Sequence, residues 1–375
     1  MKVTTTQTNL NAALSRLQGV SASAAHSSLE ILKCVKLTLR TLPSGRSVLV
    51  LTGSDLDKLV ETNAECEVID SLGECSCAIN YRRFAGVVSS AAPGTVSISI
   101  TPGNVEVKTD TGEYEFTTVD TSLFPPTPNF NTDFSVKIAS TELRRLFSST
   151  RFSAASPSEM RKVLQCTLME FENGVVRCVA TNGRSLAKAE CEASVTVDGE
   201  KSALIPQSSV ADILRLAPKD STETTIRITS ERKSAVFDFG DTELHTRLCD
   251  DTYPQYKRVI PNVADAAAIF TLGAVRVASA VKRVAVMVAD ETRYVTCGFK
   301  NGTLTISTDD DVAKEILPVE VNGECAEIRM NDSMLIDAIE SAGSDKLMLY
   351  YFGAEKPAII SNSTNYLAVV MPMRV

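Results

Sequence analysis

The chain has 375 residues, and since single domains cluster near about 100 to 150 residues, this length predicts two or three domains. Hydrophobic residues make up 44% and charged residues 22%, a balance that is typical of a globular protein and excludes a disordered one. The net charge of -8 argues against a surface coated with basic residues, but it leaves room for a locally basic face.

The first predicted element is an amphipathic helix near the N-terminus, in which Leu10, Leu14 and Leu17 recur at helical spacing. The apolar run at 48–51 then predicts a strand that ends in Thr52, within SVLVLTGSDL. A second helix is predicted to start at Asn80, a capping residue, and to present one apolar face. Two strands separated by glycine or asparagine turns follow. The first third of the chain is therefore predicted to contain two helices and several short strands.

The same order of elements recurs twice more along the chain. The second helix of each unit is predicted to start at Asn80, Pro206 and Asn331, which are 126 and 125 residues apart. A solenoid array is the alternative, but its repeat units have about 20 to 50 residues, far fewer than these. Whole domains are therefore repeated. The earlier helices of the second and third units are predicted to have apolar faces containing Leu143, Leu146, Phe147, Val275, Ala278 and Val281 or Lys282.

Two clusters of proline and polar residues without periodicity are typical of linkers. They are PPTPNFNTD at 125–133 and YPQYKRVIPNVAD at 253–265. They divide the chain into predicted domains at 1–128, 129–261 and 262–375. The predicted fold class is α+β, with three similar domains that each pack two helices on antiparallel sheets.

Residue patterns for common catalytic chemistry are missing from the sequence. GxxxxGK[ST], HExxH and GxSxG do not occur, and there are only two histidines. The ten cysteines lie mostly alone in apolar runs, which is typical of core residues, and only Cys75 and Cys77 are close together. We therefore expect no enzyme activity, no metal and no cofactor. The alternative, a cysteine nucleophile, lacks a histidine or basic cluster near any cysteine in sequence.

The C-terminus is apolar over residues 369–373, where chain ends are usually polar. Such a tail is either a final core strand or a strand whose end lines an exposed groove. Methionine suits such a groove because it repacks easily against varied partners. The residues alone leave both interpretations open.

Several segments resemble signature segments of the bacterial DNA polymerase III beta sliding clamp family, and they run in order along the chain. They are SLEILKCVKLTL at 28–39, LFPPTP at 123–128, CVATNGRSLA at 178–187, YPQYKRVIP at 253–261 and the C-terminal AVVMPMRV. The resemblance implies a DNA clamp fold and a head-to-tail homodimer whose six similar domains close a ring with helices lining the hole. It also implies a non-catalytic function in the cytoplasm, at the nucleoid: the ring encircles duplex DNA and tethers a polymerase for processive replication.

A ring that slides needs phosphate contacts that ignore sequence, which cationic side chains provide. The predicted helices together carry a positive charge and the rest of the chain is acidic, which suits a ring that repels DNA outside and admits it inside. The alternative is that each arginine is simply a solvated helix residue. By resemblance and helix placement, the DNA-facing residues are His26, Arg82, Arg83, Arg144, Arg145, Arg161, Lys162, Lys282 and Arg283.

The resemblance further implies a hydrophobic cleft for short peptides of polymerases and the clamp loader, with a glutamine and two apolar anchors. For the dimer it implies that Tyr114 and Phe116, on an edge strand, meet Val286 and Met287 of the partner subunit. The alternative is that all four lie in their own domain cores. Position by position, the cleft comprises Leu164, Thr181, Gly183, Arg184, Leu186, Pro254, Arg258, Val259, Val370, Met371, Pro372, Met373 and Arg374, with Pro357 at its rim.

The chain departs from the family pattern in two places. The family segment T-D-G-H-R-L-A is T-N-G-R-S-L-A here, so Arg184 replaces a histidine and Ser185 an arginine. Glu30 stands where the family's L-P-I-L segment has proline. We expect a different peptide preference, and the departures leave open a divergent phage or plasmid clamp that serves another replication or repair machine.

Overall fold

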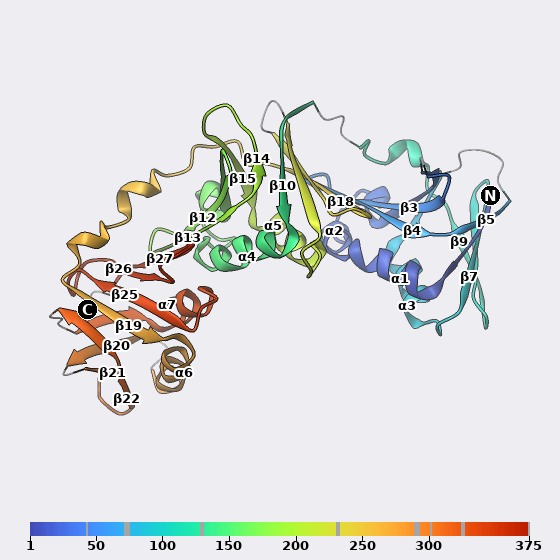
Figure 1. Ribbon diagram of the computed structural model, residues 1–375. Helices are drawn as coiled ribbons and strands as arrows, with labels where there is room; N and C mark the ends of the chain where they lie inside the picture. The colour runs from blue at the N-terminus through green and yellow to red at the C-terminus, as the bar shows by residue number, and fades with distance from the viewer. Residues whose placement is uncertain are drawn as a thin grey trace. The chain divides into compact units, whose positions relative to one another are not determined.

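The structure is a computed structural model that describes residues 1–42, 44–70, 76–127, 131–229, 233–288, 293–300, 302–323 and 327–373. Its contacts divide the chain into two compact units. Unit 1 comprises Met1–Ser135 and Ala211–Arg247, and unit 2 comprises Val136–Val210 and Leu248–Val375. Figure 1 draws their helices and strands.

Unit 1 contains antiparallel strands in two groups. One sheet has the order β5 (Glu67–Asp70), β1 (Lys2–Thr6), β7 (Thr95–Thr101), β8 (Asn104–Lys108) and β9 (Glu113–Thr117). A second series has the order β16 (Glu223–Thr229), β17 (Ser234–Asp238), β18 (Thr242–Arg247), β4 (Lys58–Glu65), β3 (Ser47–Ser54), β2 (Cys34–Thr41) and β6 (Ser76–Asn80). The alternation of buried and exposed residues along β7 and β8 matches sheets with one buried face.

The helices of unit 1 are α1 (Gln7–Arg16), α2 (Gln18–Ala24) and α3 (Tyr81–Ser90). The predicted helix start at Asn80 is confirmed, because its side chain accepts a hydrogen bond from the backbone N–H of Arg83 at 3.0 Å. The predicted leucine face of α1 is also confirmed, because Leu10 and Leu14 are fully buried. α1 and α3 pack side by side against the strands (Figure 1).

Unit 2 is built around a long antiparallel sheet. Its order is β15 (Lys201–Pro206), β11 (Cys166–Glu172), β12 (Val175–Thr181), β13 (Ser185–Glu192), β27 (Tyr366–Val370), β26 (Ala358–Ser361), β25 (Lys346–Tyr351), β19 (Ala268–Gly273) and β23 (Glu320–Gly323). A smaller sheet has the order β22 (Lys314–Pro318), β21 (Thr303–Ser307), β20 (Tyr294–Lys300) and β24 (Ile328–Asn331). β10 (Thr132–Ala139), which begins in unit 1, pairs with β14 (Ser194–Val195) through Val136 and Lys137.

The helices of unit 2 are α4 (Ser140–Thr150), α6 (Ala274–Ala285) and α7 (Asp332–Glu340), while α5 (Gln207–Leu216) begins in unit 2 and ends in unit 1. The predicted starts after Pro206 and at Asn331 are confirmed, the latter by a 3.0 Å bond from the Met334 N–H to the Asn331 side chain. Val275 was wrongly predicted to lie on the apolar face of α6, since 69% of it is exposed. Val277, two residues later, is buried instead.

Strands from neighbouring predicted domains pair directly within each unit. β18 runs antiparallel to β4 in unit 1, with Leu244 opposite Val60. β13 runs antiparallel to β27 in unit 2, with Ala187 opposite Ala368. The backbone ladder therefore continues from strands of one predicted domain into strands of another. The boundaries at 128 and 261 stay a prediction.

The cysteines match the predicted core role in part. Five are buried, namely Cys34, Cys77, Cys166, Cys178 and Cys297, while Cys66, Cys191 and Cys249 are half-buried, and all of these are free thiols. Cys75 and Cys325 lie outside the described residues. Within the described ranges, no helix has both the length and the apolar character needed to cross a membrane.

Candidate functional site

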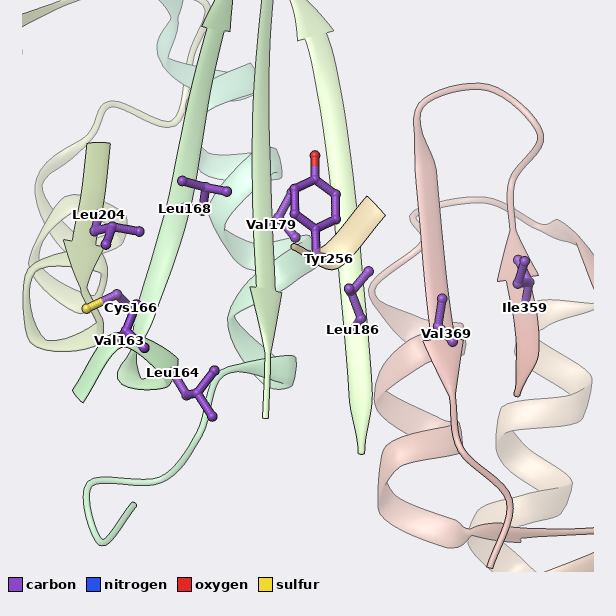
Figure 2. Packing of buried hydrophobic residues seen from close by; sticks show 10 residues of the cluster. All are labelled: Val163, Leu164, Cys166, Leu168, Val179, Leu186, Leu204, Tyr256, Ile359 and Val369. Atoms are coloured by element: carbon purple, nitrogen blue, oxygen red, sulfur yellow. The ribbon is translucent and has the colours of Figure 1, made fainter. Parts of the chain in front are cut away.

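A groove of about 630 Å³ opens on the surface of unit 2, and we call it the unit 2 groove. Much of its lining is apolar, and its residues come from five separate segments of the chain. They are Arg161, Leu164, Thr181, Gly183, Arg184, Ser185, Leu186, Pro254, Gln255, Tyr256, Val259, Pro357, Val369 and Met371. Beneath it lies a cluster of buried side chains from β11, β12, β13, β26 and β27 (Figure 2).

The turn between β12 and β13 forms one wall of the unit 2 groove. The side chain of Asn182 accepts hydrogen bonds from the backbone N–H groups of Arg184 at 2.9 Å and Ser185 at 2.8 Å. Gly183 has a φ of +84°, which glycine adopts without steric cost. Asparagine and glycine thus form the turn through local chemistry, and the side chain of Arg184 is left exposed.

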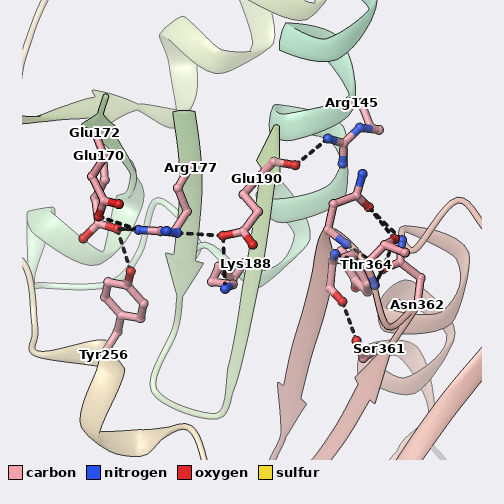
Figure 3. A network of polar contacts seen from close by, with 12 residues as sticks. Arg145, Glu170, Glu172, Arg177, Lys188, Glu190, Tyr256, Ser361, Asn362 and Thr364 are labelled. Atoms are coloured by element: carbon pink, nitrogen blue, oxygen red, sulfur yellow. Dashed lines mark hydrogen bonds and ion pairs between the residues drawn. The ribbon is translucent and has the colours of Figure 1, made fainter. Parts of the chain in front are cut away.

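The opposite wall is the short 3-10 helix η5 (Tyr256–Val259). The Tyr256 hydroxyl donates a hydrogen bond to Oε2 of Glu170 at 2.7 Å. The same carboxylate oxygen lies 3.1 Å from the Arg177 guanidinium, which also contacts Glu172 at 3.1 Å and Glu190 at 2.9 Å (Figure 3). Burial raises the pKa of Tyr256, and the Glu170 carboxylate raises it further, so the phenol remains a donor at neutral pH. This network attaches η5 to the sheet.

The C-terminal tail combines the two roles that the residues alone left open. Val370 is fully buried in β27, opposite Ser185 of β13. The next residue, Met371, donates its backbone N–H to the Arg184 carbonyl at 3.0 Å, and its partly exposed side chain lines the groove. The tail is therefore a core strand up to Val370, and Met371 directly after it lines the groove.

The structure brings together much of the cleft that resemblance implied, but the match is incomplete. Of the predicted residues, those that line the unit 2 groove are Leu164, Thr181, Gly183, Arg184, Leu186, Pro254, Val259 and Met371, together with Pro357. Arg258, Val370, Pro372 and Met373 do not line it, and Arg374 lies outside the described residues. Sequence reasoning missed Ser185, Gln255, Tyr256 and Val369, although all four lie inside segments that had been singled out.

Two models of one protein family match this chain. They describe the central domain of the DNA polymerase III beta subunit, over residues 137–255, and its C-terminal domain, over residues 257–374. Together they cover more than half of the sequence. The chain belongs to the DNA polymerase III beta subunit family.

Sequence alignments with relatives cover nearly the whole length of this clamp. The beta sliding clamp of Chlamydia muridarum is 28% identical over 90% of this chain and 91% of its own, and that of Proteus mirabilis is 27% identical over 88% and 89%. The crystal structure of the Pseudomonas aeruginosa beta subunit has a TM-score of 0.90 at 24% identity and covers 100% of both chains. The Bacillus subtilis sliding clamp reaches 0.89 at 19% identity, covering 100% of this chain and 99% of its own. The expected α+β clamp fold is confirmed.

The predicted DNA-facing residues of the clamp differ in their surroundings. His26, Arg82, Arg83 and Lys162 are exposed, and Arg82 and Arg83 lie on the outer side of α3 with Lys33 nearby in the same shallow groove. Arg145 is held by Glu142 and by the Glu190 carbonyl, each at 2.7 Å. On α6, Lys282 pairs with Glu340 and Arg283 pairs with Glu315 at 2.7 Å. Arg144 is half-buried, and Arg161 lines the unit 2 groove.

The residues predicted at the dimer seam also differ in exposure. Tyr114 lies on the edge strand β9 with 38% of its surface exposed, and Val286 and Met287, just after α6, are 81% and 55% exposed. Phe116 is buried instead, with its ring 5.8 Å from that of Phe84 in an edge-to-face contact. Phe116 thus packs into the core beneath α3.

Two further observations concern metal ligands and cysteine thiols. Among the described residues, no group of three His, Cys, Asp or Glu side chains is placed to hold a metal ion. Burial raises the pKa of Cys34, Cys166, Cys178 and Cys191, which keeps these thiols protonated and unreactive.

Proposed function

We propose that this clamp encircles duplex DNA as a head-to-tail homodimer and tethers a DNA polymerase for processive replication. Each subunit contributes three domains, 1–128, 129–261 and 262–375. The protein acts without catalysis and without a cofactor, in the cytoplasm at the nucleoid. The polymerase and the clamp loader bind through short peptides in the unit 2 groove, and this groove is the observation that carries the proposal.

The unit 2 groove suits a peptide with apolar anchors. Its floor consists of aliphatic side chains such as Leu164, Leu186 and Val369, which favour apolar groups through the area that they remove from water. Met371 at its edge adapts to different anchors. A Pseudomonas aeruginosa clamp of the same fold, with a TM-score of 0.91 at 23% identity, was crystallised bound to griselimycin.

The proposed DNA path rests on exposed cations of separate helices and loops. His26 follows α2, and Arg82 and Arg83 lie on α3, all exposed to solvent. Side chains of this kind contact phosphates without reading the base sequence, so that the ring can slide. We place Arg144, Arg145, Arg161, Lys162, Lys282 and Arg283 on the same path, with the ion pairs of Arg145, Lys282 and Arg283 reducing the charge that they offer.

The proposed dimer joins two sheet edges. β9 is the edge of the first sheet of unit 1, and β22 is the edge of the small sheet of unit 2, where Ile316 is 60% exposed. Unpaired edges with apolar side chains invite pairing with another chain. A head-to-tail dimer covers both kinds of edge, with Tyr114 of one subunit facing Val286 and Met287 of the partner subunit, while Phe116 stays in the core of its own subunit.

Retention on circular DNA tests the ring. After loading onto nicked circular duplex DNA, the protein is expected to remain bound through gel filtration and to leave when one restriction cut linearises the circle. Equal retention on circular and linear DNA contradicts encirclement. A clamp covalently closed across its seam provides the matched control, because it must stay on the circle and still slide off the cut ends.

A charge in the unit 2 groove tests the tether separately. Met371→Glu places a carboxylate against the apolar floor, so we expect both loading onto circular DNA and stimulation of the polymerase to be lost, while the protein stays dimeric in sedimentation velocity. Val312→Glu, at a site that is 64% exposed outside the groove, is the control and is expected to stimulate normally. Full stimulation by Met371→Glu contradicts the assignment of the groove.

A further inference from the structure

The turn between β12 and β13, in the wall of the unit 2 groove, begins with an asparagine–glycine pair, Asn182–Gly183. In such a pair the backbone N of the glycine can attack the side-chain carbonyl carbon of the asparagine, because glycine has no Cβ to obstruct the approach. A cyclic succinimide forms, ammonia leaves, and water opens the ring to aspartate or isoaspartate. The surrounding structure decides whether this reaction proceeds in a folded protein.

Three donors converge on the side-chain oxygen of Asn182. The backbone N–H groups of Arg184 and Ser185 donate to Oδ1 at 2.9 and 2.8 Å, and the Ser185 hydroxyl donates to it at 3.3 Å. Negative charge develops on this oxygen when the amide carbon is attacked, and N–H donors that are already fixed at these distances stabilise such charge. The turn therefore stabilises the intermediate of the cyclisation of Asn182.

The attacking group and the leaving group are both accessible. Gly183 is exposed, and a Cβ added to it would have open space around it. Its N–H, which must lose its proton, donates to the Thr181 hydroxyl oxygen at 3.2 Å. The side-chain bonds of Asn182 in the described chain all involve Oδ1, so that Nδ2, which leaves as ammonia, is not held. Water and hydroxide can therefore reach the reacting groups.

A second asparagine–glycine pair, Asn173–Gly174, has different surroundings. The Gly174 N–H donates to the Val195 carbonyl at 3.2 Å, and the Gly174 carbonyl accepts the Ala193 N–H at 3.0 Å. Backbone bonds on both sides therefore hold this glycine away from the side chain that it would attack. Oδ1 of Asn173 accepts one backbone N–H, that of Val197 at 3.0 Å, where Oδ1 of Asn182 accepts two.

A third pair, Asn322–Gly323, lies in strand β23. Its residues stand opposite Ile269 and Ala268 of β19 in an antiparallel ladder. An extended backbone in a ladder cannot turn the glycine N towards the preceding side chain without losing its strand bonds. In the fourth pair of the sequence, Asn301 lies outside the described residues.

We infer that Asn182 deamidates in the folded protein, so that the wall of the unit 2 groove changes covalently as the protein ages. The Gly183 N forms a bond to Cγ of Asn182 and gives its proton to a base in the solvent. Nδ2 takes a proton from water, and the Cγ–Nδ2 bond breaks. Water then opens the ring at one of its two carbonyls, so that one water is consumed and one ammonia is released. The reaction needs no bound peptide and is independent of the proposed function.

The two products affect the groove differently. An aspartate keeps an acceptor oxygen for the N–H groups of Arg184 and Ser185, so the turn is preserved. Isoaspartate has one more methylene in the main chain and a shorter side chain, so it cannot make these bonds in the same turn. The Arg184 carbonyl then moves, and the 3.0 Å bond that it accepts from the Met371 N–H is lost. Isoaspartate therefore releases the C-terminal tail from the groove wall.

Peptide mapping of the full-length protein by mass spectrometry tests the inference. The protein is incubated at mildly alkaline pH and sampled over days, and trypsin then releases Cys178–Arg184, in which Asn182 is the one side-chain amide. We expect Asn182 to convert about tenfold faster than Asn173, a smaller factor than a donor supplies inside a buried enzyme site because this turn is open to water. Isoaspartate should be among the products, and the rate should rise with pH.

Asn182→Gln is the matched control, because its longer side chain would have to close a larger ring, and this position should gain no mass. Hydrogen exchange at Met371 should become faster as the parent protein ages, and should stay constant in Asn182→Gln and Asn182→Asp over the same time. Equal rates at Asn182, Asn173 and Asn322, or a slower rate at Asn182, overturn the inference. Aspartate without isoaspartate also overturns it, since direct hydrolysis gives that result. Unchanged exchange at Met371 in converted protein overturns the effect on the groove wall.

Discussion

The hydroxyl of Tyr256 donates a hydrogen bond to Glu170, 86 positions earlier in the sequence, across 2.7 Å. Glu170 in turn holds Arg177, which lies between Glu170 and Glu190 on neighbouring strands (Figure 3). The η5 wall of the unit 2 groove is therefore hydrogen-bonded to ionised side chains of the sheet, so its position does not depend on the bonds within the 3-10 helix alone. A short helix with so few bonds of its own needs this support.

Tyr256→Phe removes this support and little volume. We expect the free energy of unfolding to fall by about 1.5 to 3 kcal/mol, the range for a hydrogen bond to a charged group, and peptide affinity to fall because the wall can shift. Urea denaturation and fluorescence polarisation measure the two effects. Tyr350→Phe is the control, since Tyr350 packs against the same buried cluster and its hydroxyl has no hydrogen-bond partner in the described structure. If Tyr256→Phe and Tyr350→Phe lowered stability and peptide affinity equally, the hydrogen bond to Glu170 would not be what supports the groove wall.

Lys58→Met should destabilise unit 1 strongly. Lys58 Nζ lies 2.7 Å from Asp212 Oδ2, and each side chain is only 5% exposed. Removing the ammonium leaves the buried Asp212 carboxylate with Arg215 as its one remaining ion-pair partner in the described part of the chain, at a cost of about 3 kcal/mol in the free energy of unfolding by urea. Lys108→Met, which breaks solvent-exposed pairs with Glu106 and Glu113, should lower the free energy of unfolding far less than Lys58→Met does. Similar costs would show that the Lys58 pair is not isolated from solvent.

Stability should fall in acid partly through Glu243. The hydrogen bond with His245 lowers the pKa of Glu243 to about 2, with burial opposing and Arg227 reinforcing the shift. An unfolded glutamate has a pKa of about 4.3, so the folded value is the lower one. The stabilisation is therefore complete above about pH 5 and is lost as the pH falls from about 4 to 2. Because a third of the side chain is exposed, we expect about 1 kcal/mol.

Denaturant unfolding of Glu243→Gln at neutral and acidic pH checks this expectation. The variant should lose stability at neutral pH and show a shallower decline in acid. Glu67→Gln, at an exposed position on β5, should follow the parent curve. A variant curve parallel to the parent curve at all pH values would place the acid sensitivity elsewhere.

The ion pairs on α6 should limit the affinity of the clamp for DNA. Glu315 binds the Arg283 guanidinium through both carboxylate oxygens, at 2.7 and 3.0 Å, and this bond lowers the pKa of Glu315. Glu315→Gln frees that cation. We expect tighter non-specific binding to duplex DNA and a log–log salt slope that is steeper by about one, measured by fluorescence anisotropy. An unchanged slope means that Arg283 does not reach DNA, and Glu67→Gln again provides the charge-matched control.

Two exposed valines, one in the first turn of α6 and one directly after its last turn, test the predicted dimer interface. Val286 follows the last turn and is 81% exposed, while Val275 in the first turn is 69% exposed. Val286→Glu should shift the protein from dimer to monomer in sedimentation velocity, because a carboxylate at a closed interface lacks solvent. Val275→Glu should stay dimeric. If both variants became monomeric, or if neither did, the end of α6 would not be a specific part of the dimer interface.

The sequence predicted those parts of the fold that depend on local chemistry. Asn80 and Asn331 could be identified as helix starts because each side chain bonds a backbone N–H three residues later. Val275 was placed wrongly because spacing gives the period of a helix, while the neighbouring strands decide which residues they cover.

The groove was predicted through family resemblance and was incomplete for a physical reason. Tyr256 and Glu170 meet only after β11 and η5 have been brought together, and nothing in their spacing indicates it. The pairing of Arg283 with Glu315 is likewise a product of packing, so counting helix charges overstated the free cations of α6. Only the three-dimensional structure distinguishes a neutralised arginine from an available one.

The ladder between β18 and β4 has a consequence for truncated genes. A gene that stopped at residue 128 would encode β4 without β18, so that Leu59, Val60 and their neighbours would present an open, apolar strand edge. Such edges recruit other chains into aggregates. The threefold repeat therefore does not make the protein modular. We therefore expect a chain that ends at residue 128 to aggregate, because this apolar edge is left without its partner strand.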